Sequence, residues 1–290
     1  MERDRGLGAG MMAMALFRTI ESSRPEGERL FDDPVSRCLL TPFWRVFLLP
    51  GLRHAMVAFA ERRGPGALGN LFCRTRTIDD ALCQALAEGA EQVVILGAGF
   101  DLRALRIPHI EERRVFEVDL PAPQRLKQAR LEKVFGSLPE HVVFVPVDFD
   151  HQDLGQALAA AGFRTEVRTF FIWEGVTQYI TAEAVDATFR TVSGAAPSGS
   201  GIVFTYIPRA IVDGYARSAA DEKVISAARQ GGSPWIFGID PSELEATLVA
   251  RGLLLLEEVW APDYRERYLD PIGRELSIYE GERVVLARVA

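Results

Sequence analysis

The sequence predicts a doubly wound α/β fold, in which helices cover both faces of a mostly parallel sheet. From residue 90 onward, short apolar runs alternate with helical patterns, which is typical of a parallel sheet. The run from Gln92 to Asp101, QVVILGAGFD, passes from four apolar residues directly into a Gly-x-Gly turn. This run predicts a buried strand that leads through a tight turn into a helix, as at the nucleotide-binding end of such sheets.

The first third of the chain, residues 1–89, shows no strand pattern and is predicted to form an N-terminal helical cap. Three glycines and several charges within residues 1–10 predict a frayed terminus. Helices are expected at Met11–Ile20, at 35–39 after a turn at 30–34, at Arg53–Arg62, and from Ile78 to just before Gly89. The remaining residues, 90–290, are predicted to form the sheet domain.

Seven strands are expected after the cap. Their predicted ranges are Val93–Leu96, Arg114–Val118, Val142–Val147, Thr169–Trp173, Ile202–Ile207, Leu253–Val259 and Arg283–Val289. Helices are expected between them at Pro123–Val134, at Leu154–Ala160, after a cap at Thr181 and after a cap at Asp240. The stretch Pro208–Gly238 follows the fifth strand and has no clear periodicity, so it is predicted to form an irregular lid.

Composition argues against several classes of protein. The net charge of −7 argues against a protein that binds nucleic acid or a membrane surface, because either needs a basic face. The apolar stretch Met11–Phe17 is too short for a membrane span or a secretion signal. Cys38, Cys73 and Cys83 lack the spacing of metal ligands and are expected to be reduced thiols. These observations favour a cytoplasmic protein without a metal site.

The turn after the first strand lacks one feature of a dinucleotide site. Such a turn has a third glycine three residues after the second, where this chain has Leu102. Acidic residues follow the ends of neighbouring strands: Asp119, 22 residues after Gly97, and then Asp148 and Glu174. A carboxylate at Asp119 could accept hydrogen bonds from both hydroxyls of a ribose. An acidic pocket suits a cation better than a diphosphate, which favours S-adenosylmethionine over NAD or NADP as the cofactor.

Three segments also resemble a known family. The segments Val93–Asp101, Val115–Pro121 and Phe171–Ile180 are similar to the leucine carboxyl methyltransferase group of class I S-adenosylmethionine-dependent methyltransferases, and the motifs ILGAGFD and FEVDLP within the first two are the most specific part. Upstream, residues 18–21, 30–34 and 74–80 are similar to its bacterial branch, known from mycobacteria and actinomycetes. The resemblance implies a Rossmann-like methyltransferase sheet whose last strand is antiparallel, with S-adenosylmethionine as cofactor.

The resemblance implies roles for particular residues. Arg74 corresponds to the arginine that holds the methionine carboxylate of the cofactor, and Arg76 is the runner-up. Asp119 corresponds to the ribose ligand and Glu174 to the acid beside the amino end, while Tyr179 corresponds to a tyrosine near the transfer site. The implied cofactor contacts are Arg74, Gly97, Ala98, Gly99, Asp101, Asp119, Leu120, Asp148, Phe149 and Glu174, with Asp148 and Phe149 at the adenine.

Each of these assignments has a purely structural alternative. Arg74 could form a surface salt bridge, and the glycines of the turn could serve only to pack strand against helix. Asp119 could cap the following helix, and Tyr179 could be a packing aromatic. Asp148 is the most open assignment, since Asp150 and Asp153 compete with it as helix caps.

The predicted reaction is in-line methyl transfer to an oxygen of a small-molecule or peptide acceptor, either a carboxylate or a hydroxyl. The chain has four histidines, and none of them ends a strand of the motif. A carboxylate is ionised at neutral pH and needs no general base, so the scarcity of histidine favours methyl ester formation. Tyr206, at the end of the fifth strand, is a further candidate to contact the acceptor. An NAD(P)-dependent oxidoreductase and an inactive cofactor-binding protein are the alternatives.

Overall fold

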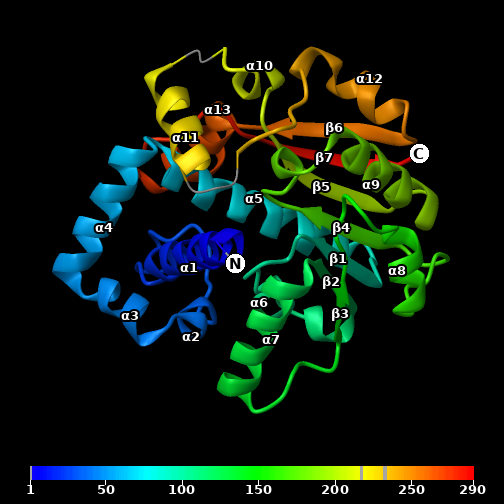
Figure 1. The fold of residues 1–290 in the computed structure, drawn as a ribbon, viewed down its shortest axis with the longest axis horizontal. Helices are drawn as coiled ribbons and strands as arrows, with labels where there is room; N and C mark the ends of the chain where they lie inside the picture. The colour runs from blue at the N-terminus through cyan, green and yellow to red at the C-terminus, as the bar shows by residue number, and fades with distance from the viewer. Residues whose placement is uncertain (1, 216–217, 231–233) are drawn as a thin grey trace.

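One seven-stranded sheet forms the centre of the protein in the computed structural model, which describes residues 2–215, 218–230 and 234–290 (Figure 1). The strands lie in the order β3-β2-β1-β4-β5-β7-β6. Their bounds are β1 Gln92–Leu96, β2 Arg114–Asp119, β3 Val142–Pro146, β4 Thr169–Trp173, β5 Gly201–Tyr206, β6 Leu253–Val259 and β7 Arg283–Val289. The pairs among β1 to β5 are parallel, and β7 is antiparallel to both of its neighbours. The predicted sheet, with its antiparallel last strand, is confirmed.

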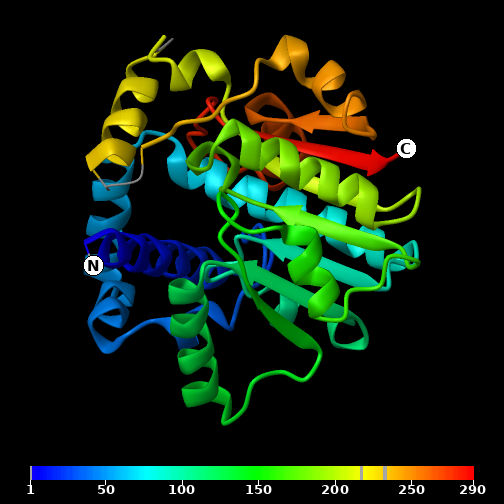
Figure 2. The same ribbon diagram turned by 45° about the vertical axis from the view of Figure 1, so that its right-hand side comes forward.

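Helices lie on both faces of this sheet (Figure 2). The α-helices are α1 Glu2–Ser22, α2 Ser36–Leu39, α3 Pro42–Arg45, α4 Pro50–Arg63, α5 Ala67–Ala87, α6 Arg103–Arg106, α7 Pro121–Phe135, α8 Leu154–Ala160, α9 Ala182–Ala195, α10 Arg209–Val212, α11 Ala219–Gln230, α12 Leu244–Val249 and α13 Ala261–Tyr264. Short 3-10 turns include η1 Val46–Leu48 and η3 Thr177–Tyr179. Among the described residues, none of the helices combines the length and the apolar character needed to span a bilayer.

The two faces of β1 belong to two different hydrophobic clusters. Val93 and Ile95 lie in a cluster with residues of α1 and α5, whereas Val94 and Leu96 lie in a cluster with residues of α8 and α9. All five residues of β1 are buried. A parallel strand covered on both sides reads as a continuous apolar run, which is why this strand could be located so closely from its sequence.

The helix α5 connects the N-terminal helices to the sheet. It contacts β4, β5 and β7, and its inner residues share one hydrophobic cluster with α1 and with β1. The N-terminal helices therefore pack directly on the sheet domain. The elements α3, η1 and α4 lie further out, at the left margin of Figure 1.

Three sequence predictions about local structure are wrong, and the first is the helix expected from Ile78, which begins at Ala67. The stretch Pro208–Gly238 is not wholly irregular, because it contains α10 and the 12-residue helix α11. Ser218 and Asp221 bond reciprocally at the start of α11, a capping arrangement that marks a helix start in the sequence. The helix expected from Met11 begins at Glu2, since a helix fixed by packing at its far end can extend through glycines that cost about 1 kcal/mol each.

Candidate functional site

The carboxyl ends of β1, β2 and β4 meet at one edge of the sheet. Leu96 lies opposite Val118, so the turn that begins at Gly97 is adjacent to Asp119. Gly97 has a left-handed backbone with φ of 68°, and a Cβ there would come within 2.3 Å of a methyl group of Val176. Glycine is required at this position both for its conformation and for the close approach.

Asp119 binds the glycine turn directly. Its Oδ2 accepts a hydrogen bond from the backbone N–H of Gly99 at 2.5 Å, and its Oδ1 accepts one from Leu120 at 2.7 Å. Burial raises the pKa of this carboxyl above its usual range. The helix α7 has Leu120 as its N-cap without a side-chain cap bond, so Asp119 is not serving as the cap. A carboxylate has about four acceptor positions, which leaves two for other donors.

Glu174, directly after β4, is the centre of a buried ion-pair network. Its carboxylate accepts from Arg103 Nη1 at 2.6 Å, from Arg74 Nε at 2.9 Å and from Arg18 Nη2 at 3.3 Å. Burial alone would raise the pKa of Glu174, but the guanidinium groups of Arg103, Arg18 and Arg74 hold it well below its usual range. Glu174 is therefore a fixed negative charge at the strand end.

Arg74 lies on the inner side of α5. Besides Glu174, it donates through Nη1 to Glu282 at 2.5 Å, and Glu282 also accepts from Asn70. Its side chain is 16% exposed, so the surface salt-bridge alternative is wrong. Arg76, the second candidate for the methionine carboxylate, instead pairs with Asp80 at 2.8 Å and is 43% exposed. Arg76 therefore does not belong to this cluster.

The sequence prediction missed two arginines of the network. Arg103, in α6, has a completely buried side chain that pairs with Asp79 at 2.7 Å and with Asp101 at 2.5 Å. The carboxylate of Asp101 is thus engaged by Arg103. Arg18 reaches the network from α1, and its buried Nε has no hydrogen-bond partner among the described residues. Arg18 could have been noticed, because it opens one of the segments that carry the family resemblance.

The predicted adenine residues lie at the end of β3. Asp148 pairs with His151 at 3.1 Å and is partly exposed. The competing acids are used elsewhere, since Asp153 caps α8 and Asp150 accepts from Thr181. Phe149 is partly buried, with its ring 6.5 Å from that of Trp173. The adenine assignment stays a prediction.

Tyr206 does not face the candidate site. Its side chain is completely buried on β5, in the cluster of α8 and α9, and its hydroxyl donates to Glu258. Burial raises the pKa of this phenol far above its usual range. The prediction that Tyr206 meets the acceptor is wrong, because in a strand alternate side chains point to opposite faces and this one points into the core. Tyr179, in η3 after β4, is 36% exposed and stays a candidate.

A second buried pair lies beneath the turn. Lys127 of α7 contacts the carboxylate of Glu117 at 2.6 Å and also donates to the backbone carbonyl of Asp101. Both side chains are nearly completely buried. Burial raises the pKa of Glu117 to about 7, although Lys127 opposes that shift. Lys127 thus ties the loop that follows the glycine turn to α7.

This pKa predicts a pH-dependent stability. Between the ordinary glutamate pKa of about 4.3 and the folded value of about 7, the folded protein retains a proton that the unfolded chain has lost. The free energy of unfolding should therefore fall as the pH rises through this range. Urea unfolding at several pH values should show this slope in the wild type and a flatter one in Glu117→Gln. Parallel slopes in the two proteins would contradict the assignment.

Comparisons with known proteins agree with this geometry. The leucine carboxyl methyltransferase family model matches residues 11–193. A proposed S-adenosyl-L-methionine-dependent methyltransferase of Bacillus subtilis is 33% identical over 208 residues, which cover 71% of this chain and 68% of the relative. Another, from Streptomyces coelicolor, is 33% identical over 214 residues and 74% of each chain.

Solved structures share the fold at lower sequence identity. A DUF574 family protein from Streptomyces avermitilis superposes with a TM-score of 0.58 at 14% identity, over 95% of this chain and 97% of that chain. A proposed methyltransferase from Thermobifida fusca gives a TM-score of 0.54 at 15% identity, over 89% of each chain. At these identities, the likeness supports the fold alone.

Proposed function

The chain belongs to the leucine carboxyl methyltransferase family and is an S-adenosylmethionine-dependent methyltransferase, and from this premise we propose that it methylates an oxygen of its acceptor, with a carboxylate as the preferred group. The oxidoreductase alternative does not survive this assignment. The convergence of arginines on Glu174 beside the glycine turn supports the cofactor assignment. The observation that carries the choice of acceptor is the position of the histidines, described below.

The residues present fit the cofactor. Its methionyl end is a zwitterion, and the network around Glu174 offers both signs of charge at one place. Glu174 suits the ammonium, while Arg74 and Arg18 suit the carboxylate. The buried Nε of Arg18, unpaired in the described part of the chain, is a donor that a carboxylate oxygen would satisfy. The glycine at Gly97 lets Val176, which follows β4, pack against the turn, so the ends of β1 and β4 lie close together at the site.

The cofactor supplies a methyl group activated on a sulfonium centre. The chain's own residues would bind and orient it: Asp119 would accept hydrogen bonds from the ribose hydroxyls, and Glu174 and Arg74 would hold the amino acid end. The helices α1 and α11 would shield the acceptor from water, and the residues that hold the cofactor and the acceptor would fix the line of attack. In this proposal Tyr179, which is 36% exposed, orients the acceptor oxygen.

The positions of the histidines support a carboxylate acceptor. His54, His109 and His151 are exposed, and His141 bonds through Nε2 to the backbone carbonyl of Ala104 at 2.7 Å. In the described chain, none of them has a recorded bond to Glu174, Asp119 or Tyr179. A hydroxyl acceptor generally needs a base, whereas a carboxylate is already a nucleophile at neutral pH.

The chemistry of the product tests this proposal. The purified protein is incubated with a small-molecule extract and S-adenosylmethionine that carries a labelled methyl group, and the labelled product is isolated. A methyl ester releases labelled methanol in mild alkali, whereas a methyl ether or an N-methyl group keeps the label. We expect alkali-labile label. Stable label would overturn the carboxylate assignment while leaving the methyltransferase assignment intact.

The ribose role of Asp119 gives a separate prediction. Asp119→Asn keeps the size of the side chain but offers one acceptor oxygen, which cannot serve both the backbone donors and the ribose. We expect cofactor binding to weaken roughly tenfold, or about 1.4 kcal/mol. Isothermal titration calorimetry measures this loss, with Asp186→Asn on α9 as the control, since Asp186 pairs only with Arg190 and Arg251 in the recorded contacts. An unchanged cofactor affinity in Asp119→Asn would mean that Asp119 holds the glycine turn and does not bind the ribose.

A further inference from the structure

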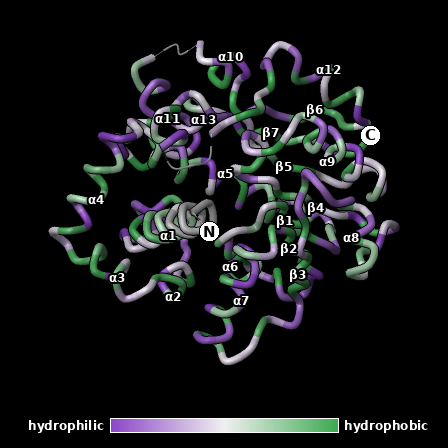
Figure 3. The backbone as a smooth tube through the Cα atoms, in the orientation of Figure 1, coloured by the Kyte–Doolittle hydropathy of each residue, from purple (hydrophilic) through white to green (hydrophobic). Residues whose placement is uncertain are grey.

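The outer surface of α3, η1 and α4, here called the arm (Pro42–Arg63), is apolar and uncovered. None of these three elements contains a fully buried residue. Five large apolar side chains of the arm are exposed: Phe43 (68%), Leu49 (58%), Phe59 (55%), Val46 (46%) and Leu52 (42%). In Figure 3 the tube through α3 and α4 alternates between apolar and polar colours along the margin of the molecule.

The helix α4 carries apolar residues on both sides. Met56, Val57 and Ala60 pack inward on the hydrophobic cluster of α1 and α5, while Leu52 and Phe59 face outward. The exposed residues of α4 thus combine the apolar Leu52 and Phe59 with the basic Arg62 and Arg63. Exposed apolar patches of this kind mark interaction sites. The outward side of α4 therefore lacks its cover in the isolated chain.

The charge of the arm differs from that of the rest of the protein. Its four arginines and one glutamate give a net charge of +3, within a chain of net charge −7, so the remaining residues carry −10. The single acid, Glu61, is turned inward: Oε2 accepts from the backbone N–H of Gly66 at 3.0 Å, and Oε1 is buried. The exposed surface of the arm thus presents apolar and cationic groups and, among its described residues, no acid.

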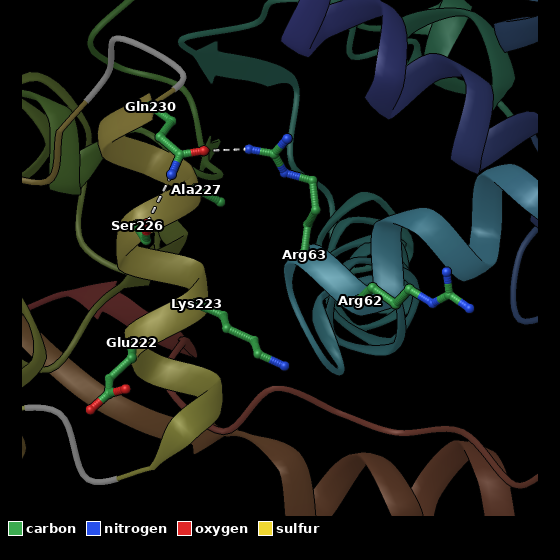
Figure 4. Close-up of a pocket in the computed structure, with 7 residues that line it drawn as sticks. All are labelled: Arg62, Arg63, Glu222, Lys223, Ser226, Ala227 and Gln230. Atoms are coloured by element: carbon green, nitrogen blue, oxygen red, sulfur yellow. Dashed lines mark hydrogen bonds between the residues drawn. The ribbon is translucent and has the colours of Figure 1, made fainter.

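The basic surface continues into the neighbouring cleft. A cleft of about 450 Å³ lies between α4 and α11 and contains Arg62, Arg63 and Lys223 (Figure 4). Arg63 donates to Gln230 of α11 at 2.7 Å and lies 5.7 Å from the centre of the Phe59 ring, while Arg62 points away from α11. The arm and the cleft therefore form one surface that is mainly cationic and aromatic, with Glu222 of α11 as an acid in the cleft lining.

We propose that the arm docks on an anionic lipid surface. Exposed aromatic and leucine side chains can enter the headgroup region of a membrane, and arginines beside them are attracted to anionic lipids. A second copy fits less well, because two-fold pairing would bring the arginines of two arms together without an acid between them. The net charge of the whole chain argued against membrane binding. That net charge is set mainly by residues outside the arm.

Vesicle co-sedimentation of the full chain tests this proposal. We expect binding to vesicles of phosphatidylcholine mixed with phosphatidylglycerol, weak binding to phosphatidylcholine alone, and loss of binding at high salt. Arg45→Gln combined with Arg62→Gln should weaken binding roughly thirtyfold, since each arginine near such a surface contributes about 1 kcal/mol. Phe43→Ser combined with Leu49→Ser should abolish co-sedimentation with the anionic vesicles, because it removes two exposed apolar side chains of the arm.

The matched control is Val249→Ser combined with Leu256→Ser, which removes two apolar side chains outside the arm that are also more than half exposed. All variants should keep the cofactor affinity of the wild type, which shows that they are folded. Failure of the wild type to sediment with the anionic vesicles would overturn the proposal. So would a dimer in analytical ultracentrifugation that dissociates in Phe43→Ser/Leu49→Ser, because it would assign the arm to a second copy.

Discussion

Replacing Arg74 with alanine is expected to weaken S-adenosylmethionine binding by about 2 to 3 kcal/mol, roughly 30- to 160-fold. The guanidinium of Arg74 is held between Glu174 and Glu282, which fixes its charge beside the place proposed for the amino acid end of the cofactor. Losing it removes a charge-assisted contact and also leaves Glu174 with fewer counter-charges. Arg74→Lys should recover part of the affinity, because an ammonium restores the charge but not the paired geometry.

Isothermal titration calorimetry measures this loss, and Arg76→Ala is the matched control. Arg76 lies two residues along the same helix but pairs with exposed Asp80, so its removal should leave cofactor affinity unchanged. Thermal unfolding of both variants separates lost binding from lost stability. A folded Arg74→Ala protein with wild-type affinity would remove Arg74 from the cofactor site, and equal losses in both variants would indicate a general effect of altering α5.

The strands were predictable because buried strands appear in the sequence as runs of apolar residues. β1 and β4 are buried at every residue, and their apolar runs end at glycine or acidic residues that mark the site edge. β6 and β7 were located at their observed bounds for a similar reason, although their burial is less complete. The acids at strand ends could likewise be placed together, since parallel strands bring their carboxyl ends to one edge.

The arginine network could not be predicted from local pattern. Arg18 and Glu174 are 156 positions apart, and Arg103 reads as an ordinary polar residue in a short helix. The sequence around Arg103 does not indicate that its side chain is completely buried. Its burial depends on ion pairs with Asp79, Asp101 and Glu174, which lie in three separate segments of the chain. Tyr206 was correctly placed at the end of a strand, but the direction of its side chain was not predicted. Successive side chains of a strand point to opposite faces, so a shift of one residue changes the face that a side chain occupies.

Replacing Arg103 with methionine is expected to lower the free energy of unfolding by about 3 to 5 kcal/mol. Its guanidinium is paired with three carboxylates, and burial alone would lower its pKa, but Asp101, Glu174 and Asp79 raise it well above the usual range. Methionine fills much of the same volume, so packing is largely kept while three buried acids lose a shared counter-charge. The loss should be larger than for an exposed pair, which is worth at most about 1 kcal/mol.

Urea denaturation followed by circular dichroism measures the change, with Arg190→Met as the control. Arg190 pairs with Asp186 on the exposed side of α9, so its removal should cost little. Asp79→Asn combined with Arg103→Met should be less destabilised than the sum of the two single variants, because the double variant leaves one fewer unpaired buried charge. If Arg103→Met lowered the free energy of unfolding no more than Arg190→Met, the network around Glu174 would position the binding residues without stabilising the fold.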